Sequence, residues 1–278
     1  MYSASDFTAP SRRALRCVSR ALISDSDVAY SESYYGFSAA DHKDGEFLTL
    51  YLLVLMHSRL FEYFSLMTSG KFGFEREALQ LLDVENFPMV VPEELTQDER
   101  ALVDQATTSL LNNQPDWQAL DRTVQKIYGL GPLDAEAIAD ALSTRSPFPA
   151  AKKLAAAPVA STWVARFCSR LQKELADVSD ASGLRFNVQT LPDHAALPWK
   201  FIAVSVGPQT SPPTLPTHWM EQADDLAVSR ITLIDAERPL LVIGLLNRSR
   251  YWTPTQARLL ASDIVWEHGA MLEERAKQ

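Results

Sequence analysis

The feature that most restricts the fold of this chain is one dense apolar stretch in its first third. Residues 47–56 read FLTLYLLVLM, and apolar side chains continue with little interruption toward Gly70. A helix that crosses a bilayer needs about 20 such residues, whereas this run meets the polar His57, Ser58 and Arg59 after about half that length. We therefore predict a core helix, surrounded by protein, that ends at Gly70, since glycine suits the position after a helix.

Chain length and cysteine content indicate a globular protein of a reducing compartment. The 278 residues suffice for two ordinary domains or one large domain, each with a buried core. Cys17 and Cys168 cannot build a disulfide framework, and no Cys/His spacing resembles a zinc site. The first 20 residues lack the apolar core of a signal peptide and carry four arginines. We expect a cytoplasmic protein with no metal and no membrane association.

Helical patterns dominate the rest of the first half. Helical periodicity is found in residues 76–88, 96–112, 116–129 and 133–143. Thr96 and Glu99 have the spacing of an N-terminal capping box, and Pro88 stops the first of these helices. The apolar FPMVVP at 87–92 is the exception, and its composition suits a lone strand.

The second half changes character. A helical pattern at 161–178 precedes four short runs typical of β-strands. The four runs are residues 184–190, 200–206, 229–234 and 239–246. Thr253 and Gln256, with proline at the first helical position, then predict the start of a C-terminal helix.

These patterns predict an α+β protein. The N-terminal half is mainly helical, and the C-terminal half holds a four-stranded antiparallel sheet flanked by helices. Prolines and an alanine-rich stretch at 147–158 indicate a boundary. We therefore predict a helical domain at 1–147, which contains a glycine-rich recognition loop, and an α+β domain with the C-terminal helix at 158–278.

Charge is distributed unevenly along the chain. The formal net charge is −9, which argues against a polyanionic partner because nucleic-acid binding needs local positive charge. Residues 77–142 contain 13 acids and 3 basic residues, whereas residues 145–173 contain six basic residues and no acid. One surface of an acidic protein can therefore be basic. The alternative is a solvated helix face without a partner.

Catalytic motifs are absent from the sequence. No glycine-rich turn follows a strand, no Walker lysine is present, and the histidines are scattered without i, i+4 pairs. The Gly129-Leu130-Gly131 turn has the spacing of a DNA-binding helix-hairpin-helix, but Asp134 and Glu136 would face the phosphate. A plain glycine-ended helix turn is favoured there, and a polar hairpin turn best explains the acids at 235–237. We expect no enzyme activity, no catalytic residue and no cofactor.

Four segments together carry a resemblance to a known family. They are residues 29–40 (AYSESYYGFSAA), 52–88 (LLVLMHSRLFEYFSLMTSGKFGFEREALQLLDVENFP), 120–131 (LDRTVQKIYGLG) and 245–269 (LLNRSRYWTPTQARLLASDIVWEHG). In this order they resemble the C-terminal target-recognition and helical region of restriction-modification type N6-adenine DNA methyltransferases. The catalytic domain of those enzymes has no counterpart in this sequence.

The resemblance implies a non-catalytic DNA-recognition or specificity subunit of a restriction-modification or phage-defence complex. Its expected partners are double-stranded DNA and a separately encoded methyltransferase, nuclease or ATPase. The alternative is a structural adaptor or regulatory subunit of such a complex that binds protein rather than DNA, as the acidic segment at 77–142 favours.

Candidate DNA-binding residues follow from side-chain chemistry. Hydroxyl, lysine and backbone donors suit phosphate oxygens, and arginine suits a guanine edge. The candidates are Thr68, Ser69, Lys71 and Arg76 of the glycine-rich loop, Lys152 and Lys153 of the basic stretch, and Arg248 and Arg250. A helix end with a simple turn explains the loop equally well.

Tyr251 and Trp252 follow these arginines and are candidate partner-binding residues. Basic residues beside aromatic ones suit DNA. They suit a protein interface equally, because tryptophan, tyrosine and arginine are its usual anchors.

Overall fold

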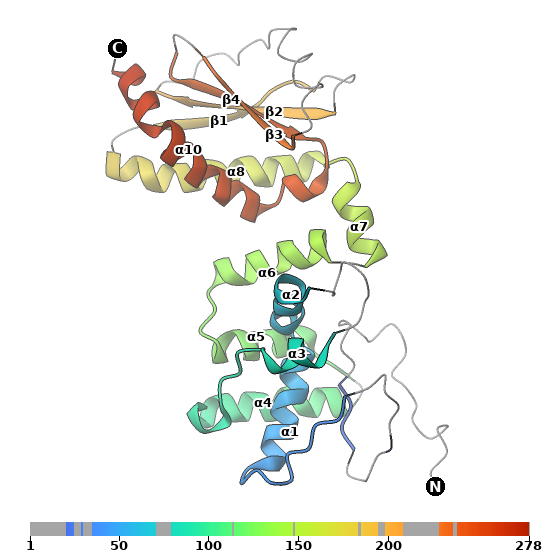
Figure 1. The fold of residues 1–278 in the computed structure, drawn as a ribbon. Coiled ribbons are helices and arrows are strands. Elements are labelled where there is room, and N and C mark those ends of the chain that lie inside the picture. Colours follow the sequence, from blue (N-terminus) through green and yellow to red (C-terminus); the bar gives the residue numbers. More distant parts are fainter. Residues whose placement is uncertain are drawn as a thin grey trace. The chain divides into compact units, whose positions relative to one another are not determined.

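The fold was analysed in a computed structural model, which confirms the predicted α+β class. The structure describes residues 21–24, 29, 35–70, 79–112, 114–146, 148–182, 185–193, 198–207, 228–235 and 238–277. The chain divides into two compact units, Met1–Phe148 and Pro149–Gln278. The first is helical and the second holds a four-stranded antiparallel sheet with helices beside it (Figure 1).

Unit 1 is built around the apolar stretch at residues 47–56. Its elements are α1 (Gly45–Met56), α2 (Arg59–Thr68), α3 (Leu81–Glu85), η1 (Pro92–Glu94), α4 (Gln97–Leu111), α5 (Trp117–Ile127) and α6 (Pro132–Arg145). Tyr51 and Val54 of α1 are fully buried against Val103 of α4 and Leu120 of α5. Protein therefore surrounds α1, as its apolar density predicts.

The single helix predicted to run to Gly70 is wrong, because the chain breaks after Met56. Ser58 is the N-cap of α2 and accepts a hydrogen bond from the Phe61 amide at 3.2 Å. The Arg59 amide donates to Asp121 Oδ1 at 3.0 Å, so the new helix start is satisfied from α5. Among the described residues no single helix is long and apolar enough to cross a membrane, and α1 and α2 reach that length only as a pair bent by 67°.

Two further sequence predictions, a capping box and a lone strand, fall in unit 1. Thr96 and Glu99 form the predicted capping box, with Thr96 N donating to Glu99 Oε2 at 2.8 Å and Glu99 N to Thr96 Oγ1 at 3.2 Å. The strand predicted at 87–92 is wrong. Residues 87–91 pair with no described strand and lead into η1, and Pro88 and Pro92 lack the N–H that a strand ladder needs.

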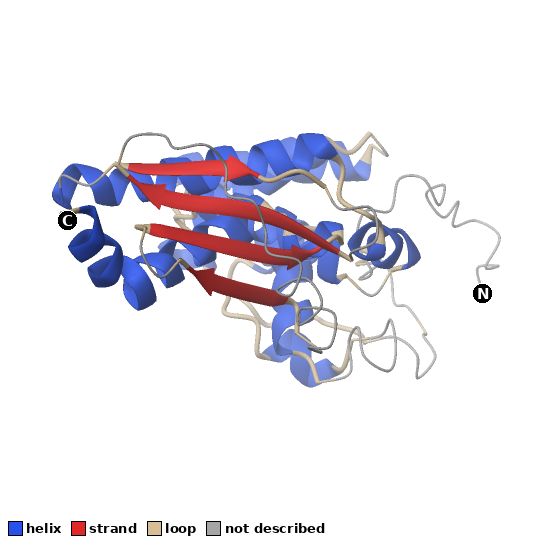
Figure 2. Ribbon diagram, turned by 90° about the horizontal axis from the view of Figure 1, so that it is seen from above, coloured by secondary structure: helices blue, strands red, loops and turns tan. Residues whose placement is uncertain are grey.

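Unit 2 places its strands and helices largely where the periodicity predicts them. Its elements are α7 (Pro149–Ala156), α8 (Ser161–Ser182), β1 (Phe186–Thr190), β2 (Trp199–Val206), β3 (Arg230–Ile234), β4 (Leu240–Leu246), η2 (Ser249–Tyr251) and α10 (Pro254–Ala276). The strands lie in the order β1-β2-β4-β3, and every neighbouring pair is antiparallel (Figure 2). Residues 148–157, which the prediction left between two domains, instead include α7 and belong almost entirely to unit 2.

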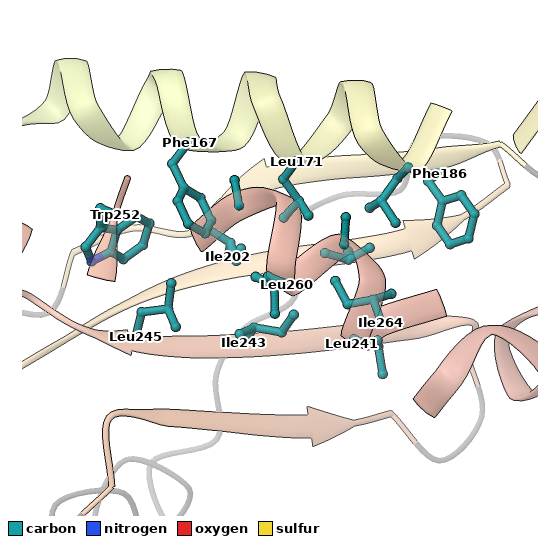
Figure 3. Close-up of a cluster of buried hydrophobic side chains, with 14 of the residues drawn as sticks. Phe167, Leu171, Phe186, Ile202, Leu241, Ile243, Leu245, Trp252, Leu260 and Ile264 are labelled. Atoms are coloured by element: carbon teal, nitrogen blue, oxygen red, sulfur yellow. The ribbon is translucent and has the colours of Figure 1, made fainter. Parts of the chain in front are cut away.

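The core of unit 2 lies between the sheet and two long helices. Successive strand residues point to opposite faces. Ile202 of β2 and Ile243 of β4 therefore meet Phe167 and Leu171 of α8 and Ile264 of α10 (Figure 3). A second apolar cluster lies on the opposite face of the sheet, and it contains Leu191, Trp199, Phe201, Ala203, Ile231, Leu240 and Val242.

We expect the stability of unit 1 to depend on pH through His57. The side chain is buried against Trp117, and its Nδ1 lies 2.9 Å from the Leu53 carbonyl oxygen. Burial lowers the pKa of His57, and this hydrogen bond opposes the shift only in part. The unfolded chain then binds a proton more readily than the folded one. The free energy of unfolding should fall as the pH drops below about 6.5, the ordinary histidine value.

Urea denaturation of the full chain at pH 7.5 and pH 5.0, followed by circular dichroism, measures this effect. His57→Asn should reduce the loss of stability at pH 5.0. An equal loss in the wild type and the His57→Asn variant would contradict the assignment.

Gly244 should tolerate no side chain. It lies opposite Phe201 and Ile231 in the centre of the sheet, and a Cβ atom there would come within 2.7 Å of Phe201 Cε1 and 2.8 Å of Ile231 Cγ1. We expect Gly244→Ala to destabilise the protein by about 1–3 kcal/mol through overpacking. Gly269→Ala is the matched control, because its Cβ would meet only Val265 at 4.0 Å. That variant should gain up to about 1 kcal/mol from helix propensity, and scanning calorimetry compares the two.

Candidate nucleic-acid interface

The candidate interface starts where β4 ends. The indole N–H of Trp252 donates to the Leu246 carbonyl oxygen at 2.9 Å, and the Arg248 amide donates to the same oxygen at 2.7 Å. Trp252 is fully buried, and its ring packs on Phe167 of α8 with 5.0 Å between centroids. The short helix η2 is therefore fixed from its core side.

A second segment, remote in sequence, is bound to this turn. The amide and hydroxyl of Ser249 both donate to the Ala157 carbonyl oxygen, at 2.9 and 3.2 Å. The Val159 amide donates to Asn247 Oδ1 at 3.0 Å. Ser249 and Ala157 are 92 positions apart in the chain. These bonds place the end of α7 beside η2.

The two joined segments carry four cations predicted to bind DNA. Lys152 and Lys153 lie on α7, and Lys153 is one helical turn before Ala157. Arg248 and Arg250 flank the buried Ser249 in sequence. All four cationic side chains are exposed. We call Lys152, Lys153, Arg248 and Arg250 the α7–η2 cationic surface.

The two segments that carry this surface contain no acidic residue. The sequence has no Asp or Glu in residues 146–173 or 239–262, which include all of α7 and η2. Within the part of the chain that the structure describes, no ion pair joins any of the four cations to an acid.

Tyr251 and Trp252 differ in their surroundings, although they are neighbours in sequence. Tyr251 is half-buried, and the Arg250 guanidinium lies over its ring at 4.8 Å from the centroid. This contact orients Arg250 beside an aromatic ring. Trp252 is a core residue with no exposed surface. The prediction that Trp252 binds a partner is wrong, because its indole is packed between the end of β4 and α8.

The glycine-rich loop is described only at its ends. The Thr68 hydroxyl donates to the Phe64 carbonyl oxygen at 2.8 Å within α2. The Ser69 hydroxyl donates to Asp83 Oδ2 at 2.8 Å, and the Gln80 amide donates to the same oxygen at 2.9 Å. Both hydroxyl hydrogens are thus donated to acceptors within the protein. Lys71 and Arg76 lie outside the described residues.

Two other motifs from the sequence have local explanations. Gly129, with φ +62°, lies two residues after the end of α5, and the Gly131 amide donates to Asp134 Oδ2 at 2.8 Å. The amide that a helix-hairpin-helix would offer to a phosphate is therefore occupied. Asp235 accepts from the backbone amide of Arg238 at 2.9 Å and from its guanidinium at 2.6 Å. Ala236 and Glu237, the rest of the predicted polar turn, lie outside the described residues. No group of three or more potential metal ligands is found among the described residues.

No protein-family model, curated protein or solved structure matches the chain significantly. Its function is therefore inferred from its own residues. Sequence reasoning missed Asn247 and Ser249, which hold the cationic segments together. Both residues lie in the segment 245–269 that carries the resemblance, but their bonds to residues 157–159 depend on the folded arrangement of unit 2.

We expect the Asn247 side chain to hold the segment after α7 beside η2. Asn247→Ala leaves the Val159 amide without its acceptor, and we expect a loss of about 1–3 kcal/mol in the free energy of unfolding. Asn247→Asp keeps an oxygen acceptor at the same position and should retain most of this stability. Urea denaturation of both variants measures the difference. Equal destabilisation by the two substitutions would contradict the role given to Oδ1.

Proposed function

We propose that the protein is a non-catalytic DNA-recognition or specificity subunit of a restriction-modification-like or phage-defence complex. In this proposal it acts with a separately encoded methyltransferase, nuclease or ATPase in the cytoplasm. The observation that carries the proposal is the α7–η2 cationic surface, where two remote segments contribute four exposed cations and no acid. The resemblance of four ordered segments to the target-recognition region of N6-adenine DNA methyltransferases supports the same function.

The chemistry of the surface suits duplex DNA. Lysine binds phosphate oxygens as a point charge, and arginine also forms paired hydrogen bonds with O6 and N7 of guanine. The lysines of α7 would thus position the duplex, while Arg248 and Arg250 have the donors for base reading. The Arg250–Tyr251 contact reduces the freedom that this arginine would lose on binding. In the same proposal Lys71 and Arg76 of the glycine-rich loop add further contacts.

A second candidate function is a structural adaptor or regulatory subunit that binds protein. The observation that favours it is the acidic surface of η1 and α4. Glu94, Asp98 and Asp104 are exposed there, in a segment with a large excess of acids. Such a surface suits a basic protein partner and repels DNA.

We expect the protein to bind a DNA duplex in a salt-dependent manner. Each phosphate contact contributes about 0.9 to the slope of log K against log salt. Simultaneous replacement of the four residues of the α7–η2 cationic surface by alanine should therefore reduce the slope by about 3 to 4. Fluorescence anisotropy with a labelled duplex between 50 and 200 mM salt measures it.

Lys43→Ala/Lys277→Ala is the control variant, because both lysines are exposed and form ion pairs with acids, Glu93 and Glu273. It should bind DNA like the wild type. Lys71→Ala/Arg76→Ala separates the contribution of the loop. Unchanged binding by the four-residue variant would remove the α7–η2 cationic surface from the proposal, and no salt-sensitive binding by the wild type would favour the adaptor.

The partner is identified by pull-down of the tagged full chain from its host, with DNA assayed on the same beads. Recovery of a methyltransferase, nuclease or ATPase together with DNA is the expected result. A stable protein partner without DNA, retained by the four-residue variant, would support the adaptor instead.

A further inference from the structure

The outer face of α10 carries two large apolar side chains in solvent. Trp266 is 91% exposed and Leu259 is 54% exposed. They are seven residues apart, so they lie two turns apart on one face of the helix. The opposite face of α10 is the one that packs on the sheet, through Ala257, Leu260, Ala261, Ile264 and Leu272. The helix thus has a second apolar stripe that the core does not use.

Small side chains lie on either side of the exposed indole. Ser262 is one turn before Trp266 and Ala270 is one turn after it, and both are exposed. Small residues on either side of a large one leave space on the helix surface into which the side chains of another helix can pack. We call Leu259, Ser262, Trp266 and Ala270 the Trp266 face.

Acidic residues surround this face. Asp263, Glu267, Glu273 and Glu274 fall within 12 positions that contain no lysine or arginine. Asp263 pairs with Arg230 of β3 and Glu273 pairs with Lys277, whereas Glu267 and Glu274 are exposed. Glu267 lies 3.7 Å from the ring of His268. Glu267 and Glu274 have no lysine or arginine partner among the described residues, whereas Arg258 lies next to Leu259 in the sequence. The rim of the apolar stripe therefore keeps a small excess of negative charge.

We propose that the Trp266 face is a docking site for an amphipathic helix of a protein partner, with an apolar stripe flanked by lysine or arginine. The exposed tryptophan supplies the anchor that dominates such interfaces, and the acidic rim selects a basic partner. A second copy of the chain brings the same acids to the interface, and an anionic membrane is repelled by them. This inference does not depend on DNA binding.

A fluorescein-labelled helical peptide of leucine and lysine, with leucine at helical spacing, is the probe, and its leucine–glutamate counterpart is the charge control. Anisotropy titrations use the full chain without DNA at 150 mM salt, roughly the physiological ionic strength. We expect the lysine peptide to bind and Trp266→Ala to weaken it at least about tenfold, the size of a modest hot spot. Leu111→Ala, at a leucine 57% exposed on α4, is the matched control and should bind like the wild type.

Charge reversal tests the rim separately. Glu267→Lys/Glu274→Lys should weaken the lysine peptide and strengthen the glutamate peptide. Unchanged melting temperatures establish that these surface variants fold. Equal binding of the lysine peptide by the wild type and Trp266→Ala would overturn the proposal.

Two further outcomes would replace the proposed partner by another. Dimerisation that disappears in Trp266→Ala, measured by sedimentation velocity, would assign the face to a second copy. Quenching of tryptophan fluorescence by acrylamide that is the same in the wild type and in Trp266→Phe would show that the chain itself covers the Trp266 indole. Quenching that is greater in the wild type is the expected result.

Discussion

The buried indole of Trp252 is the contact on which the arrangement of unit 2 depends. Its ring fills the space between the end of β4 and Phe167 of α8, and its N–H satisfies the last carbonyl of the strand. A buried tryptophan with an unpaired N–H would be costly. The turn of η2 is therefore held in one position, and α10 starts directly after it with Thr253 as its N-cap. One side chain thus links the sheet, both covering helices and the cationic turn.

Regular periodicity made most of the fold predictable. Strict alternation identified the first strand, short apolar runs typical of β-strands identified the other three, and helical spacing of Phe167, Leu171 and Leu175 identified α8. These signals are strong because one face of each element must be buried. The break between α1 and α2 was missed because apolar residues resume after the polar His57, Ser58 and Arg59, and the capping role of Ser58 depends on a bend that Asp121 supports from another helix.

The individual cations of the candidate site could be predicted from the sequence, but their proximity in the fold could not. Exposed lysine and arginine are recognisable in sequence, and four of the predicted cations do lie on neighbouring elements. Their proximity follows from hydrogen bonds of Ser249 and Asn247 that no local pattern encodes. The prediction that Trp252 lies on the surface was wrong for a related reason. An aromatic residue close to two arginines is typical of a protein interface. Only the folded structure shows that Trp252 is buried between β4 and α8.

The attachment of α7 to η2 determines where the chain can be divided. Because residues 157–159 are bonded to residues 247–249, α7 is part of unit 2 although it lies among prolines and alanines. A fragment that starts at residue 158 would lose Lys152 and Lys153 together with the helix that covers Ser249. One that starts before Pro149 would retain the whole surface. Insertions or fusions are accordingly best tolerated before this helix rather than after it.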